Sequence, residues 1–555
     1  MPDSERPDRI AWRDWGSTAF AAAAERDVPV LLSLTTAWCQ DCRRMDDATF
    51  GEPRVVANVT DRFVPVRVNA DRRPRLRERY TMGGFPTTAF LTPDGELLTG
   101  ATYLDPDGFR QMLDSVGTTW DDRGADAGRV PRALADDPTP AGSVTPAIEE
   151  HVAGQVEAQF DAEHAGWGAE AKFPLPATLE FALKRDRDRA LRSLDAVHDH
   201  LLDDVAGGFF RYAGRRDWGD VHHAKTLSTN AALIRAFADA YCYTGAERYR
   251  RAAADAVGFL VEALWNGSGF GAGQGPAGGA AYFALDADER VAEDDPRRDL
   301  GTDAGPNALA AEALLTLHAY TDADRPREYA LRTLDVLAAD HVGDDGRVSR
   351  GADRDAPVDA LSDVARVVAA FVAREQVTGE GLATARSVAD RALVELRTES
   401  GAFRDGPATG AGLLDRPLRP LDDNVALADA LLDLAALTDE TRYRTAARDA
   451  VAAFAGAMAR FGAQVANYGA VAARLCRGDL VVAVGDAPGS DLHRAAARVA
   501  DHEKVVVPNA HDRAASVLPD GESVAPGTAR VVDGEVSAPA NDPAELMARV
   551  AARTS

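Results

Sequence analysis

Two cysteines separated by two residues are the groups in this chain best suited to chemistry. The stretch from Trp38 to Cys42 (WCQDC) follows an apolar run, so a strand would deliver both thiols to the first turn of a helix. Cysteines at this spacing can form a small-ring disulfide that opens and closes reversibly. Half of a zinc site has the same spacing, but no second such pair follows, and Cys242 and Cys476 are isolated. The pattern favours a redox dithiol over a metal site, and no metal or other cofactor is expected.

The segments around the dithiol have the order of a βαβ unit followed by a β-hairpin and a helix. Residues 28–36 and 64–68 are apolar enough for strands, and residues 41–48 begin a helix between them. A hairpin within residues 83–98 and a helix over residues 105–116 complete the set. This order resembles the thioredoxin fold.

Within such a fold, Cys39 is the expected nucleophile, because free N–H groups at a helix N-terminus favour a thiolate. Cys42 would then resolve the mixed disulfide. Trp38 precedes the nucleophile, and Asp41, between the cysteines, opposes its negative charge. Pro86 begins the hairpin where thioredoxin folds hold a cis-proline beside the dithiol. The alternative is an ordinary proline that ends a turn before a strand.

One group common in thioredoxins is missing from the first strand. No acidic residue lies between Pro29 and Cys39, and Ser33 stands roughly where many thioredoxins use a buried carboxylate as a proton acceptor. A vestigial cysteine pair in a scaffold domain is therefore the alternative to a working redox site.

The composition describes a folded and strongly acidic chain. Its 555 residues carry 88 acidic and 62 basic side chains, a net charge of −26, with 46% hydrophobic residues. Only four of the bases are lysines, which resembles proteins adapted to high internal salt, although a GC-rich genome with an acidic bias is the alternative. The acids are spread along the chain, so they predict a solvated surface and no nucleic-acid partner.

Targeting and membrane signals are not expected. The first ten residues are polar, and no strongly apolar run reaches the roughly 18 residues that a membrane span needs. Four cysteines in so long a chain do not predict a disulfide framework. A cytoplasmic location without membrane contact fits these features best.

Four regions follow from the patterning. We predict a thioredoxin-like domain over residues 1–117, a linker over 118–145, an all-α region over 146–477 and a small α/β region over 478–555. The all-α region contains about twelve segments with apolar residues at three- and four-residue spacing. Turns rich in glycine followed by Phe or Val recur between helix pairs, near residues 207–210, 267–270, 345–348 and 401–403. Six such hairpins would close into an (α/α)6 toroid, and an open helical array is the alternative.

Both halves resemble one known family, the thioredoxin-like proteins that include spermatogenesis-associated protein twenty. The resemblance rests on the C-x-x-C and on several further motifs, among them Gly84-Phe85-Pro86, Lys172-Phe173-Pro174, Gly207-Gly208-Phe209-Phe210 and the run from Trp218 to Asn230. It implies a DUF255-type thioredoxin domain fused to a six-hairpin, glycosidase-like toroid. This chain departs from the family at Gln40, Asp41 and Arg43, where histidine and aromatic residues are usual, and at Ala224, where the family has glutamate.

The toroid offers a second, weaker set of candidates. Trp218, His222, Lys225, Asp286 and Asp288 could line a ligand site. Each also has a structural interpretation, since tryptophan packs in cores, histidines bond locally and aspartates cap turns. Sugar hydrolysis normally needs two placed carboxylates, and the acids lost near Lys225 argue against a glycosidase at that spot.

Two classes of function remain open. The first is a thiol–disulfide oxidoreductase that uses Cys39 and Cys42 on a disulfide-bearing protein or a small-molecule thiol partner, with the toroid binding the substrate or partner. The second is a carbohydrate-binding or carbohydrate-processing toroid, epimerase-like or glycosidase-like, with an accessory thioredoxin-like domain. A non-catalytic interaction scaffold is a third interpretation.

Overall fold

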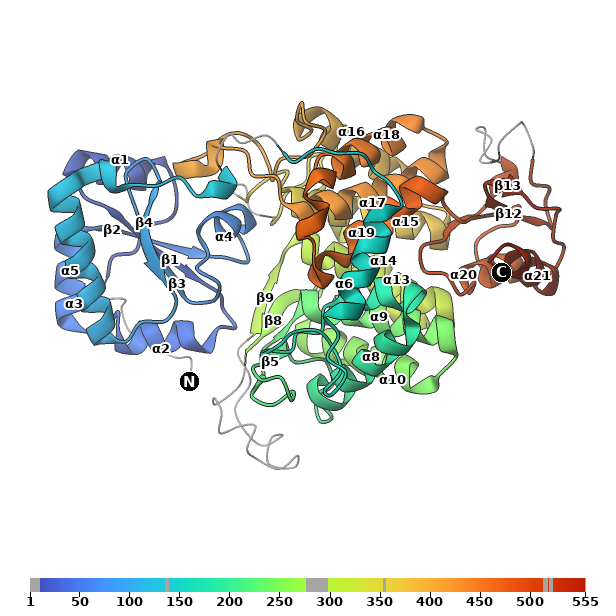
Figure 1. The fold of residues 1–555 in the computed structure, drawn as a ribbon, viewed down its shortest axis with the longest axis horizontal. Coiled ribbons are helices and arrows are strands. Elements are labelled where there is room, and N and C mark those ends of the chain that lie inside the picture. The colour runs from blue at the N-terminus through green and yellow to red at the C-terminus, as the bar shows by residue number, and fades with distance from the viewer. Residues whose placement is uncertain are drawn as a thin grey trace.

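The chain folds into a small sheet domain, a ring of helices and a C-terminal sheet domain, arranged in that order from left to right in Figure 1. The computed structural model describes residues 10–134, 139–275, 298–352, 356–512, 518 and 523–554. Within them, no helix is both long and apolar enough to cross a bilayer.

The first domain is built on a four-stranded mixed sheet of order β2-β1-β3-β4. Strand β1 pairs parallel with β2 and antiparallel with β3. Residues Val30 to Leu34 of β1 are fully buried, because apolar clusters cover both faces of the sheet. The strands are β1 (Val30–Thr35), β2 (Val64–Asn69), β3 (Thr87–Leu91) and β4 (Leu97–Ala101), and the helices are α1 (Ser17–Arg26), α2 (Gln40–Ala48), α3 (Pro53–Arg62), α4 (Pro74–Tyr80) and α5 (Pro106–Arg123).

This domain confirms the thioredoxin-like order and extends it in two ways. Helices α3 and α4 were not expected, although each begins with a proline in its first turn, and Glu52 caps α3 by accepting from the N–H of Val55. Helix α5 runs six residues into the predicted linker, because Trp120 is buried against the domain and donates to the carbonyl of Asp27. Arg129, further along, still pairs with Leu97 of β4.

The all-α region is a closed (α/α)6 toroid and not an open array. Six inner helices contact one another in sequence, and α19 returns to contact α7. Each inner helix also packs against an outer helix. The inner helices are α7 (Pro176–Arg185), α9 (Leu227–Thr244), α13 (Ala304–Thr321), α15 (Leu361–Thr378), α17 (Leu421–Thr438) and α19 (Ala466–Arg477), and the outer helices are α6 (Ala147–Ala158), α8 (Arg187–Leu201), α10 (Glu247–Phe259), α14 (Asp324–Val336), α16 (Leu382–Glu395) and α18 (Thr441–Ala452).

The recurring glycine-aromatic turns are held in the ring by a shared pattern of hydrogen bonds. At three of them an asparagine side chain from the following inner helix bonds both the N–H and the carbonyl of the buried aromatic residue. Asn230 holds Phe209 in this way, and the same pair of contacts recurs between Asn307 and Phe270 and between Asn424 and Phe403. Each asparagine therefore satisfies buried backbone groups at the point where the chain enters the inner ring.

Short strands lie at the amino-terminal ends of the inner helices, and the sequence did not predict them. They are β5 (Tyr212–Ala213) paired with β6 (Val221–His222), and β7 (Lys225–Thr226) in one sheet with β8 (Gly271–Gln274) and β9 (Arg298–Thr302). Segments of two to five residues are too short to show a period by which strands could be recognised. In Figure 1 they lie on the side of the ring that faces the first domain.

The C-terminal region is a second small sheet domain of order β11-β10-β12-β13. Its valine-rich strands pack against α20 and α21 in a cluster of their own. The strands are β10 (Val481–Val484), β11 (Val505–Val507), β12 (Ala529–Asp533) and β13 (Glu535–Val536), and the helices are α20 (Asp491–Ala497) and α21 (Pro543–Thr554).

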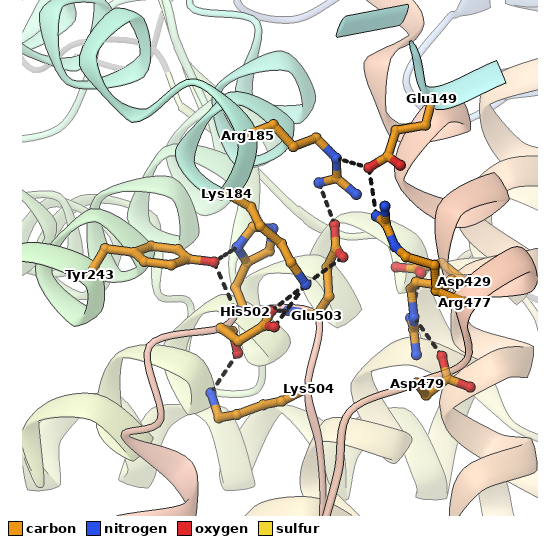
Figure 2. A network of polar contacts seen from close by, with 12 residues as sticks. Glu149, Lys184, Arg185, Tyr243, Asp429, Arg477, Asp479, His502, Glu503 and Lys504 are labelled. Atoms are coloured by element: carbon orange, nitrogen blue, oxygen red, sulfur yellow. Dashed lines mark hydrogen bonds and ion pairs between the residues drawn. The ribbon is translucent and has the colours of Figure 1, made fainter. Parts of the chain in front are cut away.

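The segment before β11 docks this domain on the carboxyl-terminal ends of the inner helices (Figure 2). Glu503 accepts from Arg185 at 2.7 Å and from Lys184 at 2.8 Å. His502 bonds the hydroxyl of Tyr243 at 3.0 Å. Burial raises the pKa of the Glu503 carboxyl, but the two cations outweigh burial and leave that pKa below its ordinary value.

Replacement of Glu503 by glutamine should destabilise this docking by about 3–5 kcal/mol at pH 7, because Arg185 would be left partly buried with one carboxylate fewer. Since the folded-state pKa of Glu503 is depressed, its stabilisation is present above the unfolded-state pKa of about 4.3 and is lost as pH falls. Denaturant unfolding should show the wild-type advantage at pH 7 and its decline in acid. The exposed Glu150→Gln variant is the control, and an equal loss in both variants would contradict the assignment.

Candidate functional site

The two predicted cysteines lie at the amino-terminal end of α2 and form a disulfide. Cys39 is the N-cap residue, and its sulfur accepts from the backbone N–H of Cys42 at 3.0 Å. The peptide bond between Phe85 and Pro86 is cis, and Phe85 packs against the apolar cluster that holds both cysteines. Asp41 points away into solvent, with its side chain 57% exposed. The helix start thus presents the sulfur of Cys39 to an N–H group that would stabilise a thiolate.

Trp38 is buried beside the disulfide and links it to a carboxylate. Its indole N–H donates to Asp71 at 2.8 Å, and the guanidinium of Arg211 lies 4.6 Å from the ring centroid. Burial raises the pKa of the Asp71 carboxyl, and the bond from Trp38 offsets only part of this effect. Asp71 is therefore a partly buried acid that bonds the tryptophan before Cys39, and it comes from the segment after β2, whereas the sequence lacks an acid in β1.

Asp71 could have been found from the strand pattern. It comes two residues after β2 ends, and the dithiol comes four residues after β1 ends. Because β1 and β2 are parallel, their carboxyl ends meet at the same edge of the sheet. An acid placed just beyond β2 is thereby brought to the dithiol.

The toroid covers the dithiol. Ala224, at the position where the family has glutamate, is fully buried in one apolar cluster with Trp38, Cys39 and Cys42. The cysteines are only 4% and 3% exposed. Gly275 completes the contact, because a Cβ atom there would lie 2.7 Å from the carbonyl oxygen of Trp38. The two cysteines are thus covered by the toroid and have little contact with solvent.

His222 is a toroid candidate that interacts with a residue of the first domain. Its ring stacks on Tyr212 with centroids 4.9 Å apart. Burial lowers the pKa of the His222 imidazole, Arg211 lowers it further, and the Asp41 carboxylate acts in the opposite direction. The structure therefore brings His222 to the same interface as the dithiol.

The remaining toroid candidates take up separate packing roles. Trp218 is buried, donates to the carbonyl of His164 at 2.8 Å and stacks on a histidine ring. Lys225 is buried against the carboxylate of Asp203 and the carbonyl of Gly207, and burial lowers its pKa. Asp286 and Asp288 lie outside the described residues. Among the residues described, no three His, Cys, Asp or Glu side chains are grouped as a metal site.

Arginines from both domains hold the dithiol against the toroid. From the first domain, Arg72 bonds Asp299 at 2.8 Å and Asp303 at 2.6 Å. Arg350 of the toroid donates in return to the carbonyl of Asp71 at 2.7 Å. Burial raises the pKa of the Asp303 carboxyl to about 6, although Arg350 and Arg72 act against it.

Helix α4 supplies a second clamp. Arg75 and Arg79 both bind the carboxylate of Asp405, and Arg79 also donates to the carbonyls of Leu413 and Arg416. The side chain of Arg79 is fully buried, and that of Asp405 is 4% exposed. These contacts fix the first domain on the amino-terminal ends of the inner helices.

The chain thus belongs to a class of proteins in which a thioredoxin-like domain is docked on an (α/α)6 toroid. In this chain the dithiol of that domain lies at the start of a helix. Residues 4–136 match a family model described as a protein of unknown function, DUF255. Over 299 residues the chain is 26% identical to human spermatogenesis-associated protein 20, a match that covers 47% of this chain and 38% of that protein. Over 266 residues it is 27% identical to the uncharacterized protein B0495.5 of Caenorhabditis elegans, covering 41% and 36%. The chain therefore carries a DUF255 thioredoxin-like domain and is homologous to spermatogenesis-associated protein 20.

Solved structures with some likeness to the toroid are more remote. Cellobiose 2-epimerase from Spirochaeta thermophila has a TM-score of 0.43 at 16% identity, with 55% of this chain and 82% of the epimerase covered. Unsaturated glucuronyl hydrolase from Bacillus sp. GL1 has a TM-score of 0.42 at 16% identity, covering 60% and 97%. The contacts between the helices of this chain define its ring without reference to either structure.

Replacement of Arg79 by methionine should expose the dithiol. The variant leaves Asp405 with Arg75 as its remaining arginine in the clamp, so docking should weaken by up to about 3–5 kcal/mol. After reduction, alkylation of Cys39 by iodoacetamide should be several times faster than in the wild type. Arg77, on the same helix but 47% exposed, provides the matched control Arg77→Met. Unchanged alkylation in the Arg79 variant would contradict the clamp.

Replacement of Asp71 by asparagine should lower the thiol pKa of Cys39. At neutral pH the Asp71 carboxylate opposes a nearby thiolate, and asparagine removes that charge while it can still accept from Trp38. The midpoint of the alkylation rate against pH should therefore move to lower pH. The exposed Asp61→Asn variant should leave the midpoint in place. A midpoint that does not move in the Asp71 variant would show that this carboxylate does not influence the dithiol.

Proposed function

We propose that the chain is a thiol–disulfide oxidoreductase whose reactive couple is Cys39 and Cys42. The observation that carries this proposal is the disulfide at the amino-terminal end of α2, with Cys39 as the N-cap residue. That position stabilises a thiolate, which is the attacking species in disulfide exchange. The partly buried carboxylate of Asp71, bonded to the Trp38 indole that precedes Cys39, supplies an ionisable group near the dithiol.

The reaction proceeds in two exchanges. The thiolate of reduced Cys39 attacks one sulfur of a substrate disulfide, forms a mixed disulfide and releases the other sulfur as a thiolate. Cys42, after loss of its proton, attacks the sulfur of Cys39 and releases the second substrate thiolate. The substrate gains two electrons, the protein is left with the Cys39–Cys42 disulfide, and an external dithiol must return two electrons for another cycle.

The toroid determines which substrates reach the sulfurs. Ala224 and Gly275 lie against the redox loop, so a folded protein disulfide has no direct approach while the domains are docked. Small disulfides are therefore the preferred substrates of the docked form, and larger partners require release of the arginine clamps. A carbohydrate function is the second candidate, but Trp218 and Lys225 are engaged in packing, so it depends on another part of the ring.

The activity can be measured with the small disulfide 5,5′-dithiobis(2-nitrobenzoate) and with insulin, each with a regenerating dithiol. We expect the small disulfide to be turned over faster than insulin, and Cys39→Ser to reduce both rates to background. Cys242→Ser, which removes one of the two free cysteines, should retain the wild-type rates. Equal rates in the wild type and in Cys39→Ser would reject the oxidoreductase proposal.

A further inference from the structure

The inner ring encloses a second site that the dithiol chemistry does not use. A cavity of about 890 Å³ is lined by all six inner helices and by residues between Pro488 and Val506 of the C-terminal region. No residue of the first domain lines it. Small-molecule sites in proteins commonly span about 300–1,000 Å³, so the cavity has room for a ligand.

A carboxylate–arginine triad lies on one wall. The guanidinium of Arg235 is held by Glu180 at 2.8 Å and by Glu312 at 2.6 Å. The second oxygen of Glu312, Oε2, is buried and accepts no hydrogen bond from the part of the chain that the structure describes. A buried carboxylate oxygen without a donor is costly, so a shift of the Glu312 side chain that brought this atom to a ligand hydroxyl would relieve that cost.

A second group joins the toroid to the C-terminal region. The hydroxyl of Tyr320 donates to Asp239 at 3.1 Å, and the ammonium of Lys504 lies 4.9 Å from the centroid of the Tyr320 ring. All three residues line the cavity. Burial raises the pKa of the Asp239 carboxyl to about 6, so this group can donate or accept a hydrogen bond near neutral pH.

A third group stands on α17 and α19. Arg474 bonds Asp429 at 2.6 Å and Asp433 at 2.5 Å. It also bonds Asp479 at 2.9 Å, a residue that does not line the cavity. Burial raises the pKa of the Asp433 carboxyl to about 7, against the effect of Arg474. The arginine is already fully shared among carboxylates.

The pairing of these charges indicates the class of ligand. Both deep arginines, Arg235 and Arg474, already serve two or more carboxylates, so an anionic ligand at either of them would have to break an existing ion pair. Arg327 and Arg366, which also line the cavity, can donate to the oxygens of a neutral ligand. A cationic ligand would meet the same arginines as like charges. A neutral ligand with several hydroxyl groups can donate to Glu312 and Asp239 and leave the ion pairs intact.

We propose that the toroid cavity binds a neutral, hydroxyl-rich small molecule of mono- or disaccharide size, with Glu312 and Asp239 as its principal acceptors. The site lies toward the carboxyl-terminal ends of the inner helices, whereas the dithiol is docked at their amino-terminal ends. The proposal is thus independent of the redox function. It gives the carbohydrate hypothesis a location other than Trp218 and Lys225.

Isothermal titration of the full chain with D-glucose and cellobiose tests the proposal, with spermidine and citrate as cationic and anionic probes. We expect saturable binding of at least one sugar and none of the charged probes. Glu312→Gln, which keeps the shape of the side chain, should weaken sugar binding at least ten-fold, and exposed Glu399→Gln should not. Cys39→Ser should bind as the wild type does, so failure of the redox proposal would leave this result unchanged.

A second variant separates binding from folding. Ala373 lines the cavity, and Ala373→Leu fills part of it without changing any charge. We expect it to abolish sugar binding while thermal unfolding stays cooperative. Failure of both sugars to bind the wild type, binding of a charged probe in their place, or sugar binding unaffected by both cavity variants would overturn the proposal.

Discussion

The ion pair of Arg79 with Asp405 is the interaction on which the arrangement of the two large domains depends. Both side chains are removed from water, and each would be strongly destabilising without the other. Separation of the domains must therefore hydrate the two charges or leave them unpaired. The position of Ala224 over the cysteines, and hence the burial of the dithiol, follows from this docking.

The toroid acts as a scaffold with two different ends. Loops that enter the inner helices receive the thioredoxin-like domain, and the opposite end receives the C-terminal sheet domain through Lys184, Arg185 and Tyr243. Figure 1 shows the ring between these two domains. Redox chemistry at one end and ligand binding in the ring can thus reside in one chain without sharing residues.

Much of this fold could be predicted from the sequence, because most outer helices carry apolar residues at helical spacing, and inner helices such as α13 and α17 are apolar on nearly all sides. The strands β5 to β9 could not, since all are short, and β7 pairs with a partner far along the chain. Within the site, the spacing of Cys39 and Cys42 identifies them as a candidate dithiol. The toroid residues that cover them, Ala224 and Gly275, could not be identified, because their only signal is their small size. The parallel pairing of β1 and β2 gives a signal for Asp71, whereas the cavity acids are brought into place by tertiary packing that no local pattern encodes.

The most direct measurement of the central claim, that the dithiol faces the toroid, is a cross-linking experiment. In the double variant Ala224→Cys, Cys42→Ser, Cys39 loses its usual partner and gains a new thiol at position 224. The two thiols can meet in the docked arrangement, because residue 224 packs in one cluster with the cysteines. Non-reducing peptide mapping after mild oxidation should find a Cys39 to residue 224 disulfide in most molecules. Recovery of Cys39 unlinked to residue 224, and freely alkylated, would contradict the account.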